Sequence, residues 1–152
     1  MKHRHWLVVA ALALAAVAAH AGQEQWTTDV EKAMEKAKTE KKILFLNFTS
    51  SDGNKTVEKF NKEILGQDKF YAYAKDNGVI LVDIILGAKK LKNPALAKQH
   101  QAAAKKYNVK KHPLVIVADP EGQPLGELEY AAGGPAPFIA KLDDVIKKGG
   151  GK

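Results

Sequence analysis

The sequence predicts an α/β domain: a mixed sheet of about four strands with helices on both faces. Three short apolar runs carry this prediction, Ile43–Phe48, Val79–Leu86 and Leu114–Val117. Each run is too short for a buried helix and suits a strand that is covered on both faces. Segments with helical spacing of apolar residues separate the runs, which favours right-handed parallel crossovers. A strong turn at Asp119–Gly122 then predicts a closing antiparallel hairpin.

The first residues have the pattern of an export signal and are not counted in the domain. Lys2 and Arg4 precede an apolar run from Trp6 to Ala18, and Ala19-His20-Ala21 supplies a small-residue cleavage site. We therefore expect residues 1–21 to be a signal peptide and the mature chain to be periplasmic or secreted. The apolar run is too short to span a bilayer, so no stable membrane insertion is expected after cleavage. An uncleaved membrane anchor is the alternative.

The composition of the predicted mature chain excludes several classes of function. It carries 22 lysines, no arginine and 17 acidic residues, a net charge of +5. Nucleic-acid readers rely on the arginine fork, so a nucleic-acid partner is not expected. A surface whose cations are all lysines indicates solubility first, and weak binding of an acidic protein or peptide second. There is no cysteine anywhere in the chain. The absence of cysteine excludes disulfides, cysteine nucleophiles and cysteine-ligated zinc. The predicted mature chain has only two histidines, so we also expect no metal and no cofactor.

The first half of the domain predicts two helices around the first strand. Thr28 and Glu31 have the spacing of a capping box, which would start a helix with one apolar stripe. Thr49–Asn54 is a polar cluster and predicts a turn after the strand. Helical spacing resumes at Lys55. The apolar positions of this second helix are Val57, Phe60, Ile64 and Leu65.

The second half predicts three more helices. Asp68 is expected to cap a short helix, and Asn93 followed by Pro94 starts another. His100 on the apolar face of that helix is expected to be a satisfied histidine at the edge of the core. Asp83 interrupts the second strand and is expected at a strand end, facing solvent or a backbone donor. The remaining expectations are a strand at Leu125–Tyr130, a Gly/Pro loop at 131–137, a last helix from Phe138, a domain over 22–148 and a loose tail at 149–152.

Two segments resemble exported proteins of the thioredoxin-like family. In that family a strand like Ile43–Thr49 is followed by a segment of the type Phe-Thr-Gly-Ser-Asp-Trp-Cys-x-x-Cys, and here Phe48–Val57 occupies this place. Tyr107–Pro113 before the third strand fits the family's proline loop. The resemblance covers essentially the whole mature chain. It implies the thioredoxin fold, with a cis peptide bond before Pro113.

The departures from the family pattern bear directly on activity. Asn54 and Val57 stand where the family has its two cysteines, Gly53 replaces the aromatic residue before them, and Asn47 is the nearest match to a buried acid. Disulfide exchange needs a thiolate that attacks through a mixed disulfide. The chain therefore lacks dithiol–disulfide chemistry. Asparagine is a good helix cap, so we expect Asn54 to keep the start of the helix.

The resemblance also implies a surface for an extended peptide or protein partner, recognised by strand addition. The residues expected to line it are Asp52, Gly53, Asn54, Val57, His112 and Pro113. Two other interpretations stay open at this point. One is an enzyme with non-thiol chemistry at His112 and Asp52, and the other is a purely structural, vestigial thioredoxin-like domain.

Overall fold

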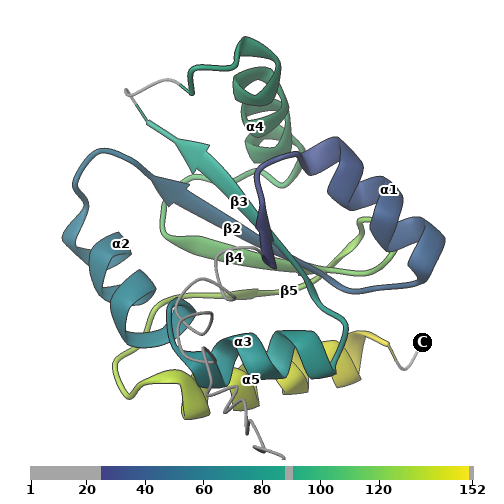
Figure 1. The fold of residues 1–152 in the computed structure, drawn as a ribbon, viewed down its shortest axis with the longest axis vertical. Coiled ribbons are helices and arrows are strands. Elements are labelled where there is room, and N and C mark those ends of the chain that lie inside the picture. The colour runs from purple at the N-terminus through teal and green to yellow at the C-terminus, as the bar shows by residue number, and fades with distance from the viewer. Residues whose placement is uncertain (1–24, 88–90, 151–152) are drawn as a thin grey trace, which may run out of the picture.

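The fold is seen in a computed structural model that describes residues 25–87 and 91–150. The predicted signal peptide and the last two residues of the predicted tail lie outside these ranges. Five strands form one sheet in the order β1-β3-β2-β4-β5 (Figure 1). The strands are β1 (Trp26–Thr27), β2 (Leu44–Ser50), β3 (Ile80–Leu86), β4 (Leu114–Ala118) and β5 (Pro124–Leu128).

The sheet is mixed, as the sequence predicts. β1, β3 and β2 pair in parallel, and β4 pairs antiparallel with both β2 and β5. The additional strand is β1, where Trp26 lies opposite Leu81. With only two residues, β1 carries no periodic pattern from which a strand could be predicted.

Helices cover both faces of the sheet (Figure 1). On one face lie α1 (Val30–Glu40) and α4 (Pro94–Lys106), and on the other lie α2 (Lys55–Phe60), the π-helical segment η2 (Asn61–Leu65), α3 (Asp68–Asp76) and α5 (Pro135–Gly149). Successive residues of β2 point to opposite faces. Phe45 therefore joins the core under α3 and α5, while Leu46 joins the core under α1 and α4.

The ends of several elements differ from the prediction. The cap of α1 is Asp29, whose side chain accepts from the Lys32 N–H, and not Thr28. Asp68 is the first residue of α3 and Gln67 holds the cap position. β2 continues through Ser50, since pairing with β3 outweighs the turn preference of Thr49 and Ser50. α5 begins at Pro135, inside the predicted loop, and includes Gly149 from the predicted tail.

His100 is a satisfied core histidine, as predicted. It is 1% exposed. Its Nδ1 accepts from the Ile85 N–H at 2.9 Å, and its Nε2 lies 2.7 Å from the Thr28 carbonyl oxygen, to which it donates in that tautomer. Both ring nitrogens are thus engaged in holding α4 to β3 and to the start of α1.

Candidate functional site

The segments singled out by the sequence meet at one end of the sheet. The chain leaves β2 at Ser50 and enters α2 at Lys55, at the left of Figure 1. The loop that leads into β4 reaches the same place, because β4 pairs with β2 in the register Leu114 to Phe48. The peptide bond between His112 and Pro113 is cis, as the family resemblance implied.

Asn54 links these two segments. Its Oδ1 accepts from the backbone N–H groups of Thr56 at 2.9 Å and Val57 at 3.3 Å, which makes it the N-cap of α2. Its Nδ2 faces the His112 carbonyl oxygen at 3.5 Å. The predicted capping role is confirmed, and the same side chain spans the gap to the proline loop.

We expect Asn54→Ala to lower the free energy of unfolding by about 1 kcal/mol, because two N–H groups at the start of α2 lose their acceptor. Asn54→Asp keeps an acceptor at the cap and should be close to neutral. Urea denaturation followed by circular dichroism measures both. A loss in Asn54→Asp equal to that in Asn54→Ala would show that the contact to His112, and not the cap, stabilises this junction.

A small groove lies beside the cis peptide bond. Its volume is about 180 Å³, and it is lined by Thr56, Lys111, His112, Pro113, Glu129 and Tyr130. Tyr130 is held in place by its hydroxyl, which donates to Glu63, and by its ring, which packs on Phe60. This hydrogen bond raises the pKa of Tyr130 above its ordinary value. At the rim, Lys111 and Glu129 form an exposed ion pair at 2.5 Å.

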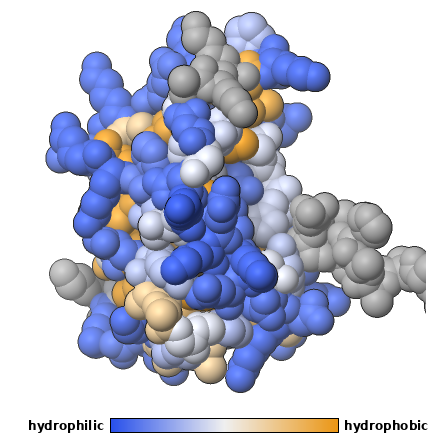
Figure 2. Space-filling model, turned by 90° about the vertical axis from the view of Figure 1, so that its left-hand side faces the viewer, coloured by the Kyte–Doolittle hydropathy of each residue, from blue (hydrophilic) through white to orange (hydrophobic). Residues whose placement is uncertain are grey.

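The surface around this end of the sheet is polar. Figure 2 shows the face that is at the left of Figure 1, and apolar colour occupies only separate areas among hydrophilic side chains. A ligand here would meet backbone groups, hydroxyls and charges more than apolar surface.

The other residues predicted for the site have different roles. Val57 is only 5% exposed, so it packs inside the domain and offers no binding surface. The main-chain φ of Gly53 is +73°, in the left-handed region that favours glycine, and nothing lies within 4 Å of the place where its Cβ would be. An aromatic residue is therefore disfavoured by the backbone at this position and not by lack of space.

Asp52 lies beside Gly87, at the end of β3. A Cβ on Gly87 would collide with Asp52 Oδ2, so this carboxylate lies against the end of β3. Within residues 25–87 and 91–150, no ion pair or hydrogen bond joins Asp52 to His112. The acid–base pair considered for a non-thiol enzyme is therefore not assembled in this structure.

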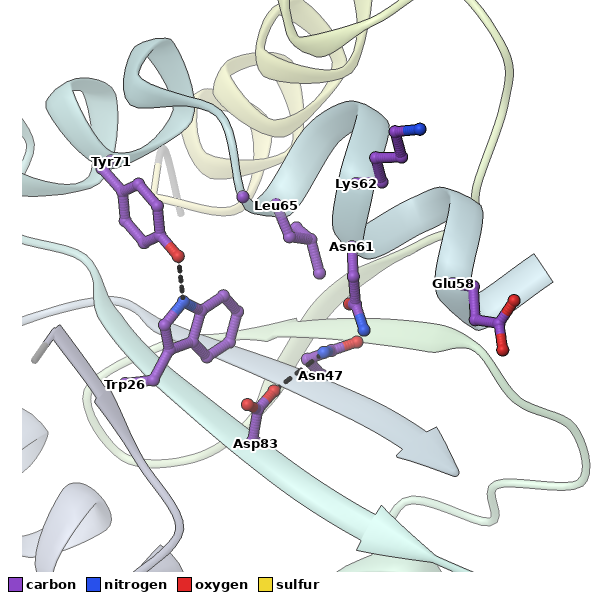
Figure 3. A pocket seen from close by; sticks show the side chains of 9 residues that line it. Trp26, Asn47, Glu58, Asn61, Lys62, Leu65, Tyr71 and Asp83 are labelled. Carbon is purple, nitrogen blue, oxygen red and sulfur yellow. Dashed lines mark hydrogen bonds between the residues drawn. The ribbon is translucent and has the colours of Figure 1, made fainter. Parts of the chain in front are cut away.

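Asn47 and Asp83 form a polar pair on the sheet beneath α2 and η2 (Figure 3). They are direct partners in the β2–β3 register, and Asn47 Nδ2 donates to Asp83 Oδ1 at 2.9 Å. The prediction for Asp83 was wrong: the residue is in the middle of β3 and its partner is a side chain. Burial raises the pKa of Asp83, while the hydrogen bond from Asn47 opposes the rise. Spacing along one strand could not reveal this pair, because it depends on the register between two strands.

We expect Asp83→Asn to stabilise the protein at neutral pH. The folded-state pKa of Asp83 is above its ordinary value of 3.8, so folding favours the protonated form. The stability that this group contributes is present in full below the unfolded-state pKa and is lost as the pH rises through the folded-state pKa. Asparagine can still accept from Asn47 but cannot ionise.

Urea denaturation of both proteins at pH 3 and pH 7 tests this. The variant should be the more stable protein at pH 7, and the difference should disappear at pH 3. A variant that is less stable at pH 7 would show that the ionised carboxylate stabilises the fold.

Over residues 25–87 and 91–150, no three His, Asp or Glu side chains are grouped so that they could hold a metal ion. No helix in the same ranges has both the length and the apolar character needed to cross a membrane.

Comparison with known proteins agrees with the fold. Residues 30–146 match the family described as thioredoxin-like domain. The disulfide bond reductase DsbH of Chlamydia pneumoniae is 28% identical over 125 residues, which is 81% of this chain and 73% of that protein. A solved structure of a DsbH oxidoreductase superposes with a TM-score of 0.75 at 24% identity, covering 80% of this chain and 83% of the other. A thioredoxin from Thermus thermophilus gives 0.60 at 18% identity, with coverages of 82% and 88%.

Proposed function

We propose that this chain, which belongs to the family of thioredoxin-like domains, is a redox-inactive binding module, because it has no cysteine. It holds an extended peptide or a segment of a protein partner. The binding surface is the groove between the start of α2 and the cis His112–Pro113 bond. The second half of the domain supplies Glu129 and Tyr130 to the same groove.

The observation that carries this proposal is the backbone of His112. Within the described ranges the His112 N–H has no hydrogen-bond partner, and the carbonyl meets Asn54 Nδ2 at the long distance of 3.5 Å. A donor and an acceptor on one residue next to a groove are what an extended chain needs to pair by strand addition. The three residues from 111 to 113 would then act as a short strand edge.

The charges around the groove favour an acidic segment. Lys55, Lys110 and Lys111 are exposed, and among residues 25–87 and 91–150 the one ion pair that these three lysines form is that of Lys111 with Glu129. Asp and Glu side chains of a partner would gain contacts with these ammonium groups, and such contacts weaken as salt screens them. We propose an exported location as well, supported by the apolar run and cleavage site before residue 22.

The test begins with peptides selected from a random heptapeptide display library on the full chain. One selected peptide is then measured by isothermal titration and by amide chemical shifts. We expect shifts centred on residues 111–113 and 128–130, and affinity that falls as the salt concentration rises. N-methylation of the peptide nitrogen that donates to His112 should weaken binding about tenfold or more, the loss of one well-made hydrogen bond.

Thr56→Arg tests the groove directly, because it places a long side chain in the groove from an exposed position at the start of α2, and Lys59→Ala is its matched control. Thr56→Arg should abolish binding, whereas Lys59→Ala, on the same helix and outside the groove, should not. A library that yields no binder, or a binder whose shifts map elsewhere and survive Thr56→Arg, would contradict the proposal and favour a purely structural domain.

A further inference from the structure

A second, larger cleft lies on the other side of α2. Its volume is about 560 Å³, and it shares no lining residue with the groove beside Pro113. Asn47 and Asp83 form its floor on the sheet, with Trp26 from β1 next to them (Figure 3). Asn61 and Lys62 of η2 and Tyr71 of α3 complete the walls.

The floor of this cleft holds an acceptor that the protein itself does not use. Asn47 is 2% exposed, and its Nδ2 is committed to Asp83. Its Oδ1 is therefore turned away from Asp83, and among the described residues this buried oxygen has no hydrogen-bond partner. In Figure 3 the amide of Asn61 reaches down from η2 toward it without a bond between them. Buried polar atoms normally have partners, so an unused acceptor at the bottom of a cleft indicates a ligand that donates.

The groups around this acceptor favour a positively charged ligand. Asp83 lies beside it, and within the described part of the chain its carboxylate accepts one side-chain hydrogen bond, from Asn47 to Oδ1, which leaves Oδ2 for another donor. Glu58 and Lys62 at the rim are exposed and of opposite sign, so the Asp83 carboxylate is the charge that is not balanced within the cleft.

Trp26 supplies an aromatic wall of fixed orientation. Its Nε1 donates to the Tyr71 hydroxyl at 3.3 Å, and its ring packs against Phe45 and Phe70. An indole next to a carboxylate is a favourable environment for an organic cation.

We propose that this cleft binds a small organic cation with several N–H groups, an alkylammonium or an alkylguanidinium. Its N–H groups donate to Asn47 Oδ1 and to the Asp83 carboxylate, and its alkyl part lies along Trp26 and Leu65. A metal ion is a poor match, because one carboxylate and one amide oxygen are far fewer than the six or more oxygen ligands that calcium takes. The site is independent of the peptide groove.

The test uses the fluorescence of Trp26. The sequence has two tryptophans, Trp6 and Trp26, so the full chain with Trp6→Phe has Trp26 as its single reporter. The probes are n-butylammonium and n-propylguanidinium chloride at constant ionic strength. The comparison compounds are 1-butanol, sodium butyrate and calcium chloride. We expect a saturable change in fluorescence with the two N–H cations, and none with the three comparison compounds.

Two variants and a control locate the binding. Asp83→Asn should weaken it about tenfold or more, and this variant is expected to be a stable protein, so misfolding would not explain the loss. Asn47→Leu removes the unused acceptor and should weaken binding as much. Glu35→Gln, which removes an exposed carboxylate on α1, on the opposite face of the sheet, should change the affinity less than about twofold. Saturation by butanol or calcium, unchanged binding in Asp83→Asn, or no response to either cation would overturn the proposal.

Discussion

Replacing Asn54 and Val57 together by cysteine is expected to give this chain the dithiol reductase activity that its natural sequence cannot have. The backbone at these positions is already suited to it. Asn54 Oδ1 lies where it accepts from the N–H groups of Thr56 and Val57. A thiolate introduced at position 54 would be stabilised by these N–H groups and by the helix N-terminus, which lower the pKa of a thiol.

Position 57 also has the environment that the second cysteine of a dithiol needs. Val57 is buried one turn into α2, so a cysteine there would be shielded from solvent and placed to attack a mixed disulfide formed at residue 54. The change removes the asparagine cap and should cost about 1 kcal/mol of stability. A domain of ordinary stability tolerates that loss.

Reduction of insulin by dithiothreitol, followed by turbidity, measures the gain. The natural chain should not accelerate the reaction, and the double variant should do so clearly. Asn54→Cys and Val57→Cys alone are the controls, since each lacks one of the two thiols, and both should remain inactive. Acceleration by the natural chain would refute its redox inactivity. An inactive but folded double variant would show that the site has diverged beyond the two cysteines.

Phe45→Ala should be among the most destabilising single substitutions in this domain, with a loss of about 3–5 kcal/mol in the free energy of unfolding. Phe45 is fully buried near the start of β2, the central strand of the sheet. Its ring meets those of Trp26 at 6.0 Å, Phe70 at 5.3 Å and Phe138 at 6.2 Å between centroids. Truncation leaves a cavity where the sheet, α3 and α5 join, and close-packed neighbours fill it only in part.

Urea denaturation followed by circular dichroism tests this prediction. Phe45→Leu keeps most of the volume and should cost much less, and Lys69→Ala, on the exposed side of α3, should stay within about 0.5 kcal/mol. A loss below about 1.5 kcal/mol in Phe45→Ala would show that the aromatic cluster can close around the cavity.

The relation to disulfide reductases helps to interpret the site. The relative from Chlamydia pneumoniae is named for reduction of disulfide bonds. The present chain has the thioredoxin-like fold, with Asn54 at the start of α2 and a cis bond before Pro113, and it has no cysteine. The proposed function rests on this combination of a formed helix start and proline loop with the absence of any thiol.

The sequence by itself determined the order of the main elements, the absence of thiol chemistry and the N-cap of α2. These follow from local signals: the length of apolar runs such as Ile43–Phe48, the absence of a residue type, and the backbone preference of Asn54. The satisfied environment of His100 was also predictable, because a histidine on an apolar helical face is usually bonded within the core.

Only the tertiary structure decided the pairing of Asn47 with Asp83, the burial of Val57 and the position of Asp52 beside Gly87. Each depends on residues that are far apart in the chain, and on a strand register or a packing angle that local sequence does not encode. The two-residue strand β1 became recognisable only by its pairing with β3. The cleft above Asp83 exists because β1, β3 and η2 meet there, so its unused acceptor could be found only in three dimensions.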